Sequence, residues 1–137
     1  MKIHLGIKGD KEYFAVNESG NRVEIDMLDA SEKQAMSPMQ LLLSGLIACA
    51  AVDLVSMVKK RRKTLIDFSG DVDGVRREEI PKKYTKIDIV FSFTSPDLKQ
   101  EEAQKLVDLA VEKYCSVSAS LDPAIEITHT AKIIRPE

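Results

Sequence analysis

The chain has no tryptophan, only two cysteines and two histidines, and nearly balanced charges. Its formal net charge of −2 gives no electrostatic case for binding nucleic acid or an anionic membrane surface. The two cysteines and two histidines do not have the spacing of zinc ligands, so we expect no metal site. Apart from these scarce residue types, the composition is that of an ordinary globular protein, with 44% hydrophobic and 31% charged residues.

The sequence also lacks internal repeats, low-complexity segments and an apolar N-terminal run of the length that a secretion signal needs. We therefore expect a cytoplasmic protein, and its 137 residues predict a single domain, 1–137. In a reducing compartment, two cysteines are more typical of free, catalytic or redox-sensing thiols than of a permanent disulfide.

Hydrophobic periodicity and turn residues predict an α+β fold. Alternating apolar residues separated by "KGDK" and "NESGN" indicate an antiparallel meander of strands. Ser37 and Gln40 form a capping box that starts the long central helix. The predicted elements are the strand meander 1–27, the helix 38–62, two long strands within 64–95, helices within 97–121 and a final strand 124–134.

The central helix has almost no polar face, because only Ser44, Asp53 and Ser56 interrupt the apolar run from Leu41 to Val58. Such a helix lies either in a membrane or inside protein. Its polar residues and short length disfavour a membrane span, so we expect it to be enclosed, with a second copy of the chain supplying part of the cover. The five cations at 59–63 are interpreted as a solvated helix end in preference to a nucleic-acid patch.

Both cysteines are candidate reactive residues, although each also has a purely structural explanation. For Cys49, spacing alone favours a small hydrophobic residue in a buried helix over a reactive thiol. Cys115 stands between two predicted helices, the second of which we expect to be capped by Ser116, and the positive end of that helix would favour a thiolate. If folding brings the two sulfur atoms together, one thiolate can be oxidised to a sulfenic acid and the other can condense with it to a disulfide.

Two further side chains are candidates for proton transfer. His129 lies on the apolar face of the final strand and could act as a base or proton donor, or simply be a buried histidine with one hydrogen bond. Glu112 lies one helical turn before Cys115 and could orient a proton, or be a surface glutamate. Asp53, one turn after Cys49, is expected to be a buried carboxylate that needs a partner.

Three segments resemble the OsmC/Ohr family, named for osmotically induced protein C and organic hydroperoxide resistance. The central helix resembles the helix that carries the family's first cysteine, and "EKYCSVSASL" resembles its second cysteine segment, with Ser116 replacing the usual proline. Arg76, Glu78, Glu79 and Pro81 resemble the family's Arg-x-Glu-Glu-x-Pro hairpin. The patterns "SPM", "EKYCSV" and "ITH" are most similar to the YhfA-like branch.

The resemblance implies an intertwined homodimer in which antiparallel sheets wrap a long central helix, and in which Cys49 and Cys115 meet in a pocket. It also implies that Cys49 attacks a hydroperoxide and that Cys115 resolves the product, whereas the helix-end argument favours Cys115 as the more acidic thiol. Peroxide-reducing members carry a glutamate after the helix-starting proline, paired with an arginine. This chain has Met39 there, its N-terminal hairpin turn "GDKE" offers Lys11 but no arginine, and Arg22 does not align with the activating arginine.

The leading hypothesis is a thiol-dependent enzyme that reduces organic hydroperoxides through Cys49 and Cys115, with Glu112 and His129 as secondary candidates. A small dithiol would regenerate the pair, and no metal, flavin or other cofactor is needed. An apolar pocket lined by Leu42, Leu46 and Ile47 would favour organic substrates. The alternatives are a protein that binds a small apolar or thiol-bearing ligand without peroxidase activity, and a regulator of other proteins' disulfides.

Overall fold

A computed structural model describes residues 1–137, and its contacts divide the chain into two compact units, Met1–Leu42 and Leu43–Glu137. The chain length predicted one domain. The division arises because each unit has a three-stranded sheet whose strands pair only within that unit. The boundary falls inside the long helix α1, Pro38–Lys60.

The first unit is the predicted antiparallel meander, with strands β1 (Ile3–Gly9), β2 (Glu12–Asn17) and β3 (Arg22–Asp26). Alternate residues on paired strands share one face of this sheet. That face is apolar except for Asn17 and is largely exposed, and its other members are Ile3, Leu5, Ile7, Tyr13, Ala15, Val23 and Ile25.

The second unit has a mixed sheet in the order β4 (Asp67–Arg76), β5 (Tyr84–Thr94) and β6 (Glu126–Ile134). β4 and β5 form the predicted antiparallel hairpin, but β5 and β6 are parallel, where the family resemblance implied antiparallel sheets. The reason is the connection between them, which contains α2 (Gln100–Leu109), the π-helical turn η1 (Ala110–Tyr114) and α3 (Ser116–Ser120). A helical crossover of this length returns the chain in the same direction.

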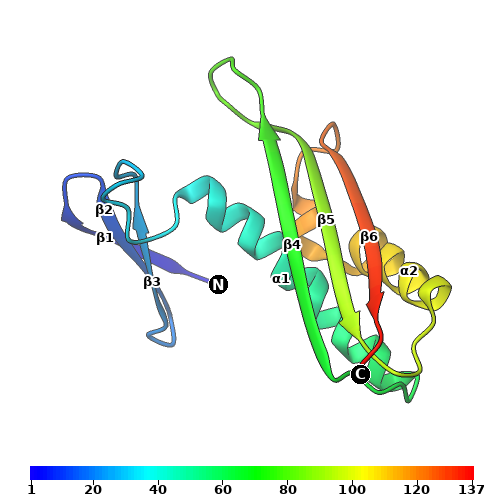
Figure 1. Ribbon diagram of the computed structural model, residues 1–137. Helices are drawn as coiled ribbons and strands as arrows, with labels where there is room; N and C mark the ends of the chain where they lie inside the picture. Colours follow the sequence, from blue (N-terminus) through cyan, green and yellow to red (C-terminus); the bar gives the residue numbers. More distant parts are fainter. The chain divides into compact units, whose positions relative to one another are not determined.

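Within the second unit, the main part of α1 and helix α2 lie on the same face of the sheet (Figure 1). The core between them is built from one stripe of α1, the inward residues of β5 and the apolar face of α2 and η1. Its fully buried members include Leu46, Ala50, Leu54, Val58, Ile87, Ile89, Phe91, Phe93, Ala103, Leu106, Val107 and Ala110. Phe68 of β4 stacks on Phe91, with ring centroids 5.5 Å apart.

Helix α1 is buried along one stripe only, although its sequence predicted cover on every side. The residues on its opposite side, Gly45, Ala48, Val52 and Ser56, are exposed, and Val52 is 72% exposed. By length and composition α1 would pass as a membrane span, a test that core helices also pass. A single chain therefore leaves most of this apolar helix without cover.

Candidate functional site

Cys115 lies at the junction between η1 and α3, where it acts as the N-cap of α3. Its sulfur accepts a hydrogen bond from the backbone N–H of Ser118, at 3.4 Å. The sequence predicted Ser116 as the cap, but Ser116 is already the first helical residue because Cys115 has the extended backbone that a cap requires. The Cys115 thiol donates in turn to the carbonyl oxygen of Leu46, 3.8 Å away in α1.

Burial raises the pKa of the Cys115 thiol, which is only 3% exposed. The Ser118 N–H lowers this pKa, but the neighbouring Cys49 thiol raises it further through a hydrogen bond and through its charge. The expectation that Cys115 is the more acidic thiol because of a helix end is therefore wrong. Helix α3 has only five residues, so its dipole is too small to offset the loss of hydration.

Cys49 lies in α1, three residues after Leu46, and its side chain is half-buried. Cys49 neighbours Cys115, because its thiol raises the pKa of Cys115 through a hydrogen bond and through its charge. Both cysteines are free thiols. Folding thus makes neighbours of two thiols from distant parts of the chain, one in α1 and one after η1.

His129 and Glu112 are also brought together. His129 projects from β6 towards the α2–η1 helix, where its Nε2 lies 3.2 Å from Oε1 of Glu112. Its Nδ1 lies 3.0 Å from Oδ1 of Asp108. The two ring nitrogens face different carboxylates, and the structure holds no group of three or more His, Cys, Asp or Glu side chains arranged for a metal ion.

Other predicted residues lie in varied places. Asp53 is half-buried in an open hollow of about 260 Å³, lined also by Ser56, Met57, Lys60 and Tyr114. Leu46 is fully buried in the core and does not line an open pocket, contrary to prediction, because it faces the sheet side of α1. Ile47 is half-buried and Leu42 is 37% exposed.

The residues at or near the positions of the family's activating glutamate and arginine belong to the first unit. Met39 lies in the first turn of α1, and Lys11 adopts positive φ in the turn between β1 and β2. Arg22 pairs with Glu24, and its guanidinium lies 3.9 Å from the centre of the Phe14 ring. Arg22 is therefore already engaged within sheet A, the sheet of β1 to β3.

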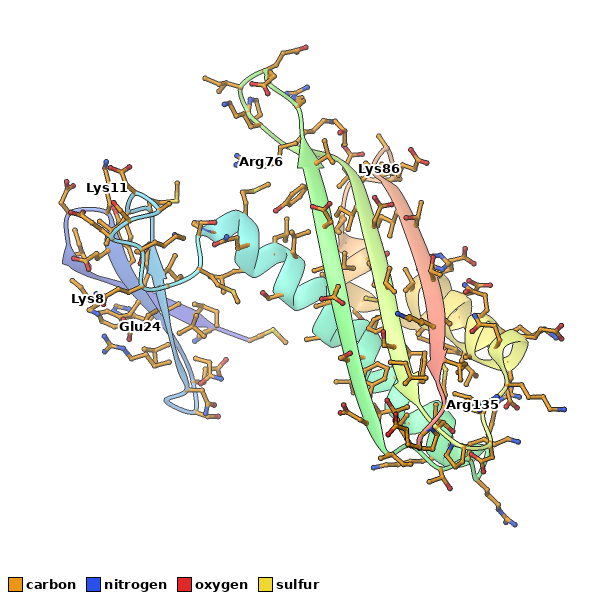
Figure 2. All side chains as sticks on the ribbon, in the orientation of Figure 1. Lys8, Lys11, Glu24, Arg76, Lys86 and Arg135 are labelled. Carbon is orange, nitrogen blue, oxygen red and sulfur yellow. The ribbon has the colours of Figure 1, made fainter.

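The Arg-x-Glu-Glu-x-Pro segment forms the connection between β4 and β5, as the resemblance implied. Arg76, at the end of β4 in Figure 2, donates from Nε to the carbonyl of Lys82, at 2.7 Å. Arg77 donates similarly to the carbonyl of Pro81, at 2.8 Å. The side chains of the two arginines thus connect the start of this loop to its end by hydrogen bonds.

Sequence reasoning missed two partners in this region, Asp108 and the Leu46 carbonyl. Asp108 precedes Glu112 by four residues, so both project from one side of the same helix, and this spacing was a detectable signal. The Leu46 carbonyl carries no side-chain signature. Only the packing of η1 against α1 reveals it as an acceptor.

The model of the family described as OsmC-like protein matches residues 30–130. Protein YhfA of Escherichia coli K12 is 37% identical over 119 residues, which cover 87% of this chain and 89% of YhfA. A crystal structure of a hypothetical protein from Aquifex aeolicus is 25% identical, with a TM-score of 0.86 over 99% of this chain and 97% of that one. The organic hydroperoxide resistance protein OhrB of Bacillus subtilis shares the fold, with 21% identity and a TM-score of 0.64 over 96% and 98% of the two chains. The α+β architecture, the two-cysteine segments and these matches together place the chain in the OsmC-like family.

Proposed function

We propose that this protein is a thiol-dependent peroxidase that reduces organic hydroperoxides, with Cys49 attacking and Cys115 resolving. The observation that carries the proposal is the contact of the Cys115 thiol with the Leu46 carbonyl of α1, one helical turn before Cys49, whose thiol neighbours Cys115. Cys49 is half-buried and can meet a substrate, whereas Cys115 is buried, is held as a donor to Leu46 and has a raised pKa. The greater exposure of Cys49 supports the order of attack that the family resemblance implies, in which Cys49 reacts first.

The reaction balances without a metal or flavin. The Cys49 thiolate attacks the outer oxygen of the hydroperoxide, which leaves Cys49 as a sulfenic acid and releases an alcohol after protonation. The Cys115 sulfur then attacks the Cys49 sulfur, and water leaves as the disulfide forms. A small dithiol reduces that disulfide by exchange and is itself oxidised to a cyclic disulfide.

The protein is also proposed to work as a cytoplasmic homodimer. The uncovered side of α1 and the apolar face of sheet A are both exposed in a single chain. Apolar surfaces of this extent are typical of sites where another protein surface packs. A second copy, as in the intertwined dimer implied by the resemblance, would cover both. Family relatives named for organic hydroperoxide resistance support the choice of substrate class.

The test is to titrate free thiols after adding one equivalent of cumene hydroperoxide to the reduced protein. We expect both thiols to be lost together, with a mass decrease that matches one intramolecular disulfide. Cys115→Ser should instead accumulate a sulfenic acid at Cys49 that dimedone traps. Unchanged thiol content in the wild type, or equal loss in Cys49→Ser, would rule out the peroxidase.

A second candidate function is a binding protein that has kept the fold without peroxidase activity. The raised pKa of Cys115 and the methionine at position 39 favour it. In that case the Cys49 thiol should also have a pKa above the free value of about 8.5 when alkylation is followed against pH. Trapping of mixed disulfides with other proteins by Cys115→Ser would instead indicate a regulator of their disulfides.

A further inference from the structure

Three turns of the helix formed by α2 and η1 contact strand β6. Gln104 binds the strand backbone twice, because its Nε2 donates to the His129 carbonyl at 3.1 Å and its Oε1 accepts from the Ala131 N–H at 2.8 Å. One turn later Asp108 meets Nδ1 of His129, and another turn later Glu112 meets Nε2. His129 thus spans the point where the α-helix becomes a π-helix.

The charge of this cluster depends on the imidazole. The His129 side chain is 11% exposed and has two carboxylate oxygens within 3.2 Å. A neutral imidazole leaves a nitrogen lone pair beside one carboxylate, whereas an imidazolium carries an N–H on both ring nitrogens and a positive charge between the two carboxylates. Nδ1 is buried and lacks a well-directed hydrogen bond, so its contact with Asp108 depends on charge.

No other charged group competes for the ring. From β5 the residue paired with His129 is the apolar Ile89, and the nearby Asp88 instead accepts from the Thr128 hydroxyl. Asp108 also accepts from Gln104 at 2.9 Å, which fixes its position. The cluster therefore has two carboxylates around one titratable ring.

The π-helical turn matters because Cys115 follows it directly. A π turn holds one more residue per hydrogen-bonded ring than an α turn, so it rotates everything that comes after it. Relaxation of η1 to an ordinary α turn would reorient Cys115 away from the Leu46 carbonyl and from Cys49. π turns are rare and are frequently found at functional sites.

We propose that His129, as an imidazolium, is a positioning residue that holds the π turn η1 and so presents Cys115 to Cys49. Closure of the Cys49–Cys115 disulfide is then faster when His129 is protonated. Neither carboxylate touches the sulfur atoms in this arrangement, and His129 acts only through the helix. The inference rests on the proposed pairing of the two cysteines as a disulfide.

The experiment measures the rate of disulfide closure with diamide, which takes two electrons and two protons from the two thiols. Closure is followed between about pH 5.5 and 8.5 in the wild type and in His129→Gln, a range over which histidine changes its charge. At the acid end of this range we expect disulfide closure to be about fivefold faster in the wild type than in His129→Gln. A larger difference is not expected, because partly exposed ion pairs contribute only a small free energy. The ratio of the two rates should fall towards one as the pH rises.

Asp108→Asn and Glu112→Gln should each reproduce part of the effect, and Glu101→Gln, which removes a carboxylate from the same helix without contacting His129, should not. Amide hydrogen exchange over residues 110–114 should be faster in His129→Gln than in the wild type at the acid end. A rate ratio that is equal to one or independent of pH would overturn the proposal. A protein that closes with diamide but not with cumene hydroperoxide would refute the peroxidase alone.

Discussion

At the scale of single residues, Asp26 organises the segment that leads from sheet A into α1. It is 3% exposed, and its carboxylate accepts from Lys33 Nζ at 2.7 Å and from the backbone N–H groups of Gln34 and Ala35 at 2.9 and 2.8 Å. Several hydrogen bonds together lower the pKa of Asp26 to about 2, against the opposing effect of burial, and the one from Lys33 is the largest cause. Backbone hydrogen bonds from Gln34, Ala35 and Leu28 contribute to the same lowered value.

This lowered pKa predicts an acid-sensitive contribution to stability. Because the folded protein holds the carboxylate ionised more strongly than the unfolded chain does, the contribution is complete above about pH 4 and is lost as the pH falls through about 2. Asp26→Asn should lower Tm by several degrees at pH 7, and the difference from the wild type should shrink as the pH approaches 2. Circular dichroism melts would measure this, with the exposed Asp71→Asn as the control. A difference that stays constant with pH would contradict it.

Residue type and helical spacing indicated which residues lie together better than they indicated acidity. Cys49, Cys115, Glu112 and His129 were chosen in this way, and the structure places Cys49 near Cys115 and Glu112 near His129, while their roles stay predictions. The acidity of Cys115 was wrong because the sequence shows a helix start but not the depth of burial. Burial depends on the packing of η1 against α1, which no local pattern specifies.

At the scale of elements, β4 accommodates α1 through two glycines on its inward face. A Cβ at Gly70 would lie 2.9 Å from the Ile47 and Phe91 side chains, and one at Gly74 would lie 2.5 Å from the Tyr84 ring. These two inward positions of β4 therefore need glycine for close approach. The helix and the neighbouring aromatic rings fill the space that side chains would occupy.

Substitution of these glycines is predicted to overpack the interface between α1 and the sheet. Gly74→Ala should destabilise the protein by about 1–3 kcal/mol, and Gly70→Ala should cost less because the tip of Ile47 can move. Urea denaturation would measure both, with Ser69→Ala on the outward face of β4 as the control. Equal stability of Gly74→Ala and the wild type would show that the Tyr84 ring adjusts freely.

The order and type of most elements followed from periodicity and caps. The capping box is present as predicted, because Ser37 N–H donates to Gln40 Oε1 at 2.9 Å and Gln40 N–H donates to Ser37 Oγ at 3.4 Å. The π turn was not predictable, because residues 110–114 have the composition of an ordinary helix. The parallel pairing of β6 was also not predicted, although the helical crossover before it is long enough to return the chain in the same direction.

At the scale of the whole molecule, α1 is the element that supports the proposed second copy of the chain. Its apolar residues extend around the helix, yet only the stripe of Leu46, Ala50, Leu54 and Val58 is buried. The sequence predicted a fully enclosed helix, and the single chain encloses one side. The remaining apolar surface lowers the free energy of association only if a partner removes it from water.

Val52 lies at the centre of the uncovered side and provides the test of the proposed dimer. The wild type should sediment as a dimer, and Val52→Arg should weaken the dimer by at least about a hundredfold, because an unpaired charge would be buried between the helices. Val90→Arg is the matched control, since Val90 is 36% exposed on the outward face of the second sheet, away from both helices. Sedimentation velocity over a range of concentrations separates the outcomes. If the wild type is monomeric, or if both variants dissociate equally, a second copy of the chain does not cover the exposed side of α1.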